Sequence, residues 1–103
     1  MLFRSNKMQD IKKLSECYVR TKTSCNGLSF VAPLWELADE ASALEDGEQK
    51  HRLLSQIYAD LCLWRRAAEH FAKIAPNNKK DIKRLAMLQD AARKNGDKYG
   101  FER

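Results

Sequence analysis

Apolar side chains recur every three or four residues along most of the chain, with charged residues between them. This spacing places the apolar residues on one side of an α-helix, which is typical of a helix packed on a core. The pattern predicts helices over residues 8–20, from Pro33 to about residue 45, over 48–62, over 64–75 and over 79–95. The apolar stripe of the last helix comprises Ile82, Leu85, Ala86, Leu88 and Ala92.

Residues that typically begin or end helices separate these segments. A polar stretch closed by Asn26-Gly27, a strong turn pair, predicts that the first helix ends near residue 20 and that a loop of about ten residues follows. Pro33 suits the first position of a helix, where a missing N–H costs nothing. Three further ends are predicted at Asp46-Gly47, Pro76 and Asn95-Gly96, and Asn78 is expected to cap the last helix.

No segment alternates apolar and polar residues for long enough to predict a strand. We therefore expect an all-α fold, a small bundle of about five helices joined by short connections. The chain of 103 residues has the length of one small domain, residues 1–103. Within it we expect an N-terminal helical hairpin over residues 8–45, and a helix-turn-helix pair with a capping helix over residues 48–99.

The predicted third and fourth helices carry a more specific pattern than amphipathicity requires. Large, small and aromatic residues follow one another in the order and spacing of a tetratricopeptide repeat: Leu54-Ser55, Tyr58, Trp64, Ala67 and Phe71. The small residues would let two antiparallel helices approach closely while the aromatic ones fill the space beside the crossing. The segment resembles one tetratricopeptide unit, and Leu88-Gln89 and Ala92 fit a second unit truncated to a capping helix.

The sequence also departs from the tetratricopeptide pattern. Ile74 stands where a small residue is expected, and Pro76 comes about three positions early. No unit with the same period precedes residue 48. The alternative interpretation is a generic helical hairpin within a small bundle, because helix packing alone often produces stripes of Leu, Ala and aromatic residues.

The resemblance implies that a peptide or a partner helix binds in a concave groove formed by the first helix of each unit. The family's carboxylate clamp needs Lys and Asn at set places in consecutive units, and the Asn members are missing here, so a C-terminal carboxylate is not the favoured ligand. Carried over position by position, the groove residues are Gln49, Arg52, Gln56, Ala59, Asp60, Lys83, Asp90, Arg93 and Lys94.

Charge is distributed unevenly along the chain. Lys and Arg total 19 against 14 Asp and Glu, a formal net charge of +5. Residues 1–25 hold six bases and two acids, residues 76–103 hold eight bases and four acids, and residues 26–75 hold five bases and eight acids. The basic ends are either a solvated surface that pairs with the acidic centre, or a surface for an acidic partner helix or an anionic ligand.

A rival hypothesis is a small basic regulatory protein that binds nucleic acid through its C-terminal helix. Three Asp residues interrupt the basic cluster, however, and the only aromatic residues nearby are Tyr99 and Phe101. We therefore expect a protein–protein interaction module, adaptor or chaperone-like, that binds another protein or itself, with nucleic acid as the alternative. The bases in question are Lys79, Lys80, Lys83, Arg84, Arg93, Lys94 and Lys98.

Few residues suggest catalysis. His51 and His70 are the side chains that ordinarily titrate near neutral pH, and we expect both at the surface or at its boundary. Cys17, Cys25 and Cys62 are odd in number and widely spaced, which indicates neither a disulfide framework nor a metal site. No apolar run is long enough to cross a bilayer, and no secretory signal is evident. We expect a cytoplasmic protein without enzymatic activity, cofactor or metal.

Overall fold

The computed structural model describes residues 7–24 and 31–102 of the chain. Within these residues it contains helices and no strand, which confirms the expected all-α fold. The predicted turn at Asn26-Gly27 lies outside the described residues. The five helices are α1 (Lys7–Ser24), α2 (Val31–Ser42), α3 (Glu48–Asp60), α4 (Trp64–Ala72) and α5 (Lys79–Asn95).

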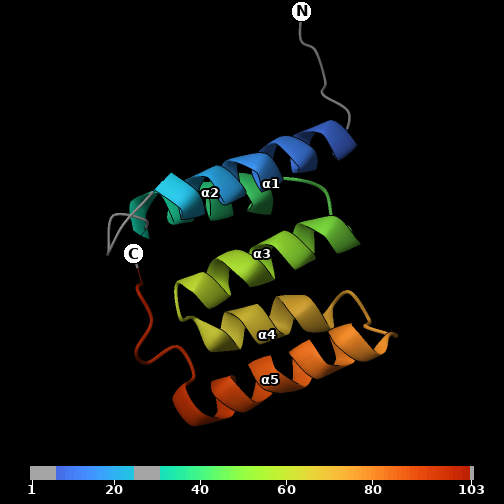
Figure 1. Cartoon of the computed structure of the whole chain (residues 1–103), viewed down its shortest axis with the longest axis vertical. Coiled ribbons are helices and arrows are strands. Elements are labelled where there is room, and N and C mark those ends of the chain that lie inside the picture. Colours follow the sequence, from blue (N-terminus) through green and yellow to red (C-terminus); the bar gives the residue numbers. More distant parts are fainter. Residues whose placement is uncertain (1–6, 25–30, 103) are drawn as a thin grey trace, which may run out of the picture.

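The helices form a stack in which neighbours along the chain are also neighbours in space (Figure 1). α1 and α2 pack together at one end, and α3 packs on both of them, mainly on α2. α4 packs on α3, and α5 covers the other side of α4. α2 and α5 consequently lie at opposite ends of a molecule whose longest dimension is 49 Å.

The core consists of two groups of buried side chains that meet at Tyr58. The first group fills the space between α1, α2 and α3, where Leu34, Leu54 and Ile57 are almost wholly buried. The second group lies between α4 and α5 around Phe71. Tyr58 packs against both groups, so α3 joins the two halves of the stack.

The first helix is longer than its sequence predicts, because α1 continues to Ser24 instead of ending near residue 20. The Thr23 hydroxyl lies within hydrogen-bonding distance of two carbonyl oxygens of the preceding turn, 3.2 Å from that of Val19 and 3.0 Å from that of Arg20. Such back-bonding satisfies a polar side chain inside a helix. A polar, β-branched stretch is therefore accommodated where a loop was expected.

The second helix differs from the prediction at both ends. It begins at Val31, so Pro33 lies in its first turn and is not its first residue. It ends at Ser42, before the expected Asp46-Gly47. The Lys50 ammonium group donates to the carbonyl oxygens of Ser42 at 3.1 Å and Leu44 at 2.7 Å. A side chain from the following helix therefore satisfies acceptors that the helix end leaves open.

The ends of α5 match the prediction, but its buried stripe does not. The Asn78 side chain accepts a hydrogen bond from the backbone N–H of Asp81, and Gly96 ends the helix with φ +57°. Ile82, expected in the core, is 52% exposed, and Ala86 is also exposed. The extensive packing of α5 is with α4, so its buried side is a narrow stripe centred on Leu88.

The chain after α5 forms a C-terminal strap, residues 96–102, that returns along the stack towards α2 (Figure 1). The Phe101 backbone N–H donates to the carbonyl oxygen of Leu61 at 2.8 Å. The Trp35 indole N–H donates to the carbonyl oxygen of Phe101 at 2.9 Å. The Arg66 guanidinium lies 3.3 Å from the Asp97 carboxylate. The strap thus connects α2, the end of α3 and α4.

Candidate interaction face

Arg52 connects α3 to α5 by an ion pair. Its guanidinium donates to both carboxylate oxygens of Asp81, at 3.2 and 3.1 Å, and to Glu48 at 3.1 Å. The Asn78 amide donates to the same Asp81 carboxylate at 2.9 Å. These hydrogen bonds, first that from Arg52, lower the pKa of Asp81, so the carboxylate stays charged and the cap of α5 is fixed. The charge of Arg52 is balanced within the molecule.

Asp60, at the other end of α3, connects this helix to α1. Its carboxylate accepts a hydrogen bond from the Tyr18 hydroxyl and one from the Lys22 ammonium at 3.4 Å. Burial raises the pKa of Tyr18, and the hydrogen bond to Asp60 raises it further. The charge of Arg84 on α5 lies close enough to oppose that rise. Asp60 therefore joins α3 to α1.

Two arginines lie over the buried Phe71 ring. The guanidinium carbon of Arg52 is 5.7 Å from the ring centroid and that of Arg84 is 6.0 Å from it. Both distances are within the range of a cation–π interaction. The buried Phe71 ring therefore helps to position both guanidinium groups, one from α3 and one from α5.

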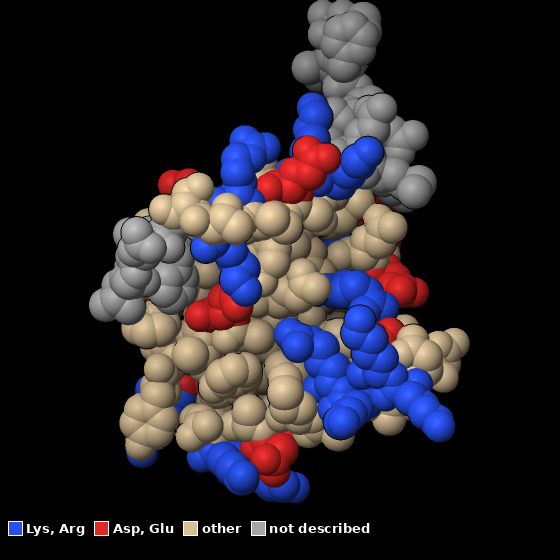
Figure 2. All heavy atoms as spheres, in the orientation of Figure 1, with Lys and Arg blue, Asp and Glu red and all other residues tan. Residues whose placement is uncertain are grey.

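The first half of α5 presents a basic surface, which we define as Lys79, Lys80, Lys83 and Arg84. None of the four forms an ion pair with any residue that the structure describes. Figure 2 shows Lys and Arg gathered on the side of the stack where both α3 and α5 begin. Two large apolar side chains of the same helix, Ile82 and Met87, are 52% and 51% exposed. The surface thus combines uncompensated positive charge with exposed apolar area.

The structure distributes the predicted groove residues over several places. On α3, Arg52 and Asp60 form the ion pairs described above, and Gln56, one turn from each, is half-buried. Lys83 belongs to the basic surface. On the second half of α5, Arg93 and Lys94 both pair with Asp90, with the Lys94 ammonium 3.1 Å from the Asp90 carboxylate. Ala59 is half-buried, and Gln49 lines a cavity beside α1.

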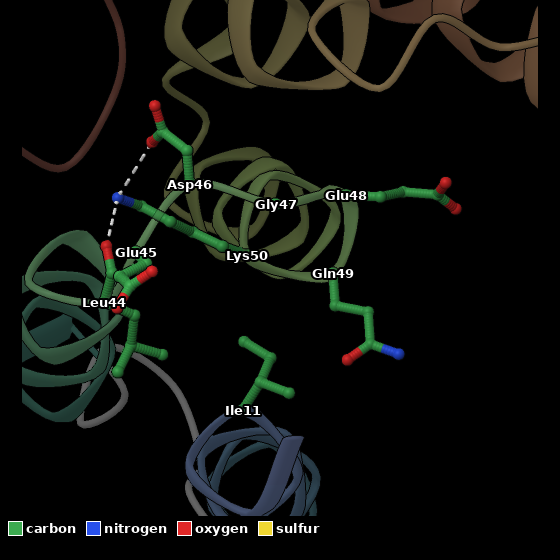
Figure 3. Close-up of a pocket in the computed structure, with 8 residues that line it drawn as sticks. All are labelled: Ile11, Leu44, Glu45, Asp46, Gly47, Glu48, Gln49 and Lys50. Atoms are coloured by element: carbon green, nitrogen blue, oxygen red, sulfur yellow. Dashed lines mark hydrogen bonds and ion pairs between the residues drawn. The ribbon is translucent and has the colours of Figure 1, made fainter. Parts of the chain in front are cut away.

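That cavity, of about 230 Å³, lies where α1 passes the connection from α2 to α3 (Figure 3). Ile11 and Leu44 form its apolar wall. Lys50 crosses one side, where it donates to the Leu44 carbonyl and approaches the Asp46 carboxylate at 3.4 Å. A second, more polar hollow of about 480 Å³ lies beside the C-terminal strap, next to Arg65. Neither cavity lies between α3 and α5.

His51 and His70 form a pair between α3 and α4. Their Nδ1 atoms are 3.0 Å apart and their rings stack, with Tyr58 stacked on the other side of His70. His51 is only 8% exposed and thus buried, so the prediction of a place at the surface or its boundary was wrong for this residue. Burial, and after it the charge of the neighbouring His51, lower the pKa of His70 to about 4. The sequence offered no signal for this pair because its members lie on different helices.

Comparison with known proteins adds no relative. No family model, curated protein or solved structure matches the chain. The tetratricopeptide resemblance and the absence of enzymatic activity therefore stay predictions. Among the described residues, no group of three or more His, Cys, Asp and Glu side chains could hold a metal ion. None of the described helices is both long and apolar enough to cross a bilayer.

Proposed function

We propose that the chain is a small protein–protein interaction module, an adaptor or chaperone-like protein, that binds an acidic amphipathic segment of a partner. The observation that carries the proposal is the basic surface on the first half of α5 together with the exposed Ile82 and Met87. The segment would lie along the exposed side of α5, where helical spacing places Lys79 and Lys83 between Ile82 and Met87.

The physical case rests on several weak contributions acting together. A single exposed ion pair contributes at most about 1 kcal/mol, so one lysine alone would not define a binding surface. Four cations near a helix N-terminus, where the helix dipole is also positive, attract a partner with several carboxylates. Covering Ile82 and Met87 adds an apolar contribution of about 25 cal/mol per Å² removed from water.

The proposal can be tested with a fluorescent, helical, amphipathic peptide of about 15 residues that carries Glu one turn apart on one side and Leu on the other. We expect binding, measured by fluorescence anisotropy, to weaken at least about tenfold in Lys79→Glu/Lys83→Glu, because attraction becomes repulsion. The matched control Lys12→Glu/Lys13→Glu makes the same charge change on α1 and should bind as the wild type does. Equal binding by both double variants would contradict the proposal.

Nucleic acid remains the second candidate, because the same unpaired cations could contact phosphates. A fluorescent single-stranded oligonucleotide is the probe for this alternative. Its binding should fall log-linearly and steeply with salt and should not depend on apolar side chains. Ile82→Ser/Met87→Ser separates the two functions, since it removes apolar contact and leaves every charge in place. If the wild type binds the peptide and this variant does not, the result supports the protein-binding module. If the wild type does not bind the peptide, and both proteins bind the oligonucleotide equally well, the result supports the alternative.

A further inference from the structure

The exposed side of α2 is as acidic as the first half of α5 is basic. Between residues 31 and 48 the chain has six acidic residues and no Lys or Arg. Glu36 and Glu40 are exposed on α2, one helical turn apart, with Asp39 between them. Neither glutamate forms an ion pair with any described residue. α2 is therefore complementary in charge to the basic surface, because its exposed side carries carboxylates one helical turn apart.

These two surfaces cannot meet within one molecule. α2 packs its buried side on α1 and α3, and α5 packs its buried side on α4. The two helices lie at opposite ends of the stack, with their exposed sides turned away from the core (Figure 1). A second copy of the chain can bring them together, because its α2 would lie beyond the α5 of the first copy.

We propose that the chain self-associates head to tail, with α2 of one copy docked on the basic surface of α5 of the next. The proposal rests on the proposed function, since it names the partner of the same α5 surface. Glu36 and Glu40 have the same one-turn spacing as Lys79 and Lys83, so antiparallel or parallel helices can pair both charges at once. Exposed Ala32 on α2 and Ala86 on α5 are small enough to let the two helices approach closely.

Such an interface is heterologous, because different surfaces of the two copies meet. It leaves one α2 and one α5 free in every dimer, so further copies can add, and the assembly either closes into a ring or grows as a chain. The net charge of +5 on each copy opposes association. At about 0.1 M salt, however, the Debye length is about 10 Å, so the facing acidic and basic surfaces interact while more distant charges are screened.

Sedimentation velocity on the full chain tests the proposal. At about 0.1 M salt we expect the mean mass to rise above the monomer mass of 11.9 kDa as the protein concentration increases, and at about 1 M salt, where the Debye length is about 3 Å, to return to it. Lys79→Glu/Lys83→Glu and Glu36→Lys/Glu40→Lys should each stay monomeric. The matched control Lys12→Glu/Lys13→Glu should associate as the wild type does.

The decisive measurement is an equal mixture of the two monomeric variants. Each supplies the surface that the other lacks, so the mixture should regain association at about 0.1 M salt. Circular dichroism on each variant confirms that its helices are intact. A wild type that is monomeric at every concentration, or a mixture that stays monomeric, would overturn the proposal. If the wild type is monomeric but still binds the acidic peptide, self-association fails and the proposed function stands; if Lys79→Glu/Lys83→Glu changes neither property, both fail.

Discussion

His51 and His70 are the titratable pair on which the pH response of the molecule depends most directly. At 3.0 Å between the Nδ1 atoms, one ring must donate and the other accept, so the accepting ring must be neutral and the two rings cannot both be protonated while this hydrogen bond persists. The charges around the pair are mostly positive, with Lys50 on α3 and Lys73 after α4, against Asp46 before α3. A proton on either ring therefore meets repulsion as well as burial.

We expect the stability of the protein to fall as the pH drops from about 6.5 to about 4. The pKa of His70 is about 4 in the folded chain and about 6.5 in an unfolded one, so below pH 6.5 the unfolded chain binds more protons. Each pH unit in this range costs at most about 1.4 kcal/mol. We expect a total loss of about 2 kcal/mol by pH 4, less than this limit allows, because water still reaches part of His70. Urea unfolding at several pH values between about 4 and 6.5 measures this loss in the free energy of unfolding.

The control for this prediction is His70→Gln, which removes the titrating ring. Its free energy of unfolding should change much less between pH 6.5 and pH 4.5 than that of the wild type. The carboxylates with lowered pKa, Asp81 and Asp90, lose their contributions only as the pH falls to about 4 and below, so they do not contribute to the difference. The same slope in both proteins would show that His70 is not the responsible group.

At the scale of elements, α4 shows how a helix can begin without a local cap. Leu63 precedes it and offers no side-chain hydrogen bond to the first turn. The Asp97 carboxylate, from the C-terminal strap, accepts the backbone N–H of Arg65 at 3.0 Å. Asp97, 32 positions away from Arg65 in the sequence, thus caps the N-terminus of α4. This role usually belongs to a Ser, Thr, Asn or Asp directly before the helix.

Asp97→Ala should lower the free energy of unfolding by about 1 kcal/mol or somewhat more, because it removes this cap and also the ion pair with Arg66. Asp97→Asn keeps an oxygen that can accept the Arg65 N–H and loses only the charge, so we expect a smaller loss. Urea unfolding of the two variants separates the contributions. Equal losses would mean that the ion pair, and not the cap, stabilises this end of α4.

The positions of the helices could be predicted from the sequence, because apolar spacing, Asn78 and Gly96 act locally. The wrong ends have causes that no local pattern contains. Thr23 satisfies its hydroxyl by back-bonding, and Lys50 reaches back to the carbonyls that follow α2. For the same reason, only part of the candidate site could be predicted. The sequence places Lys83 on a basic helix, but it does not show the partners of Arg52 and Asp60, because these come from other helices.

At the scale of the whole molecule, the C-terminal strap was missed because its contacts are with residues far away in the sequence, such as Trp35 and Leu61. Gly100 is where it passes closest to the core. A Cβ atom at this position would lie 2.3 Å from Leu63 Cδ2 and 2.9 Å from the Cys62 carbonyl oxygen, closer than real atoms approach. Leu63 is fully buried and has little room to move. The strap therefore needs glycine at this point.

Gly100→Ala should lower the free energy of unfolding by about 1–3 kcal/mol, the usual range for forcing an extra methyl group into a packed site. The matched control is Gly47→Ala, since a Cβ atom there would meet nothing within 4 Å, and we expect a change of less than about 1 kcal/mol. Thermal unfolding by circular dichroism suffices for both. Similar unfolding temperatures for the two variants would show that the C-terminal strap can shift to accommodate the extra methyl group without a loss of stability.

A stack of helices in which each contacts mainly its neighbours behaves like a one-dimensional array, and such arrays can unfold progressively from either end. Here the hydrogen bond from Trp35 to Phe101 joins segments 66 residues apart and links the last part of the described chain to α2. If α5 detached from α4, the C-terminal strap that follows it would lose its position, and α2 would lose its contact with Phe101. Because this contact links the two ends of the stack, we expect fraying at one end to be coupled to fraying at the other, and the molecule to unfold as one cooperative unit.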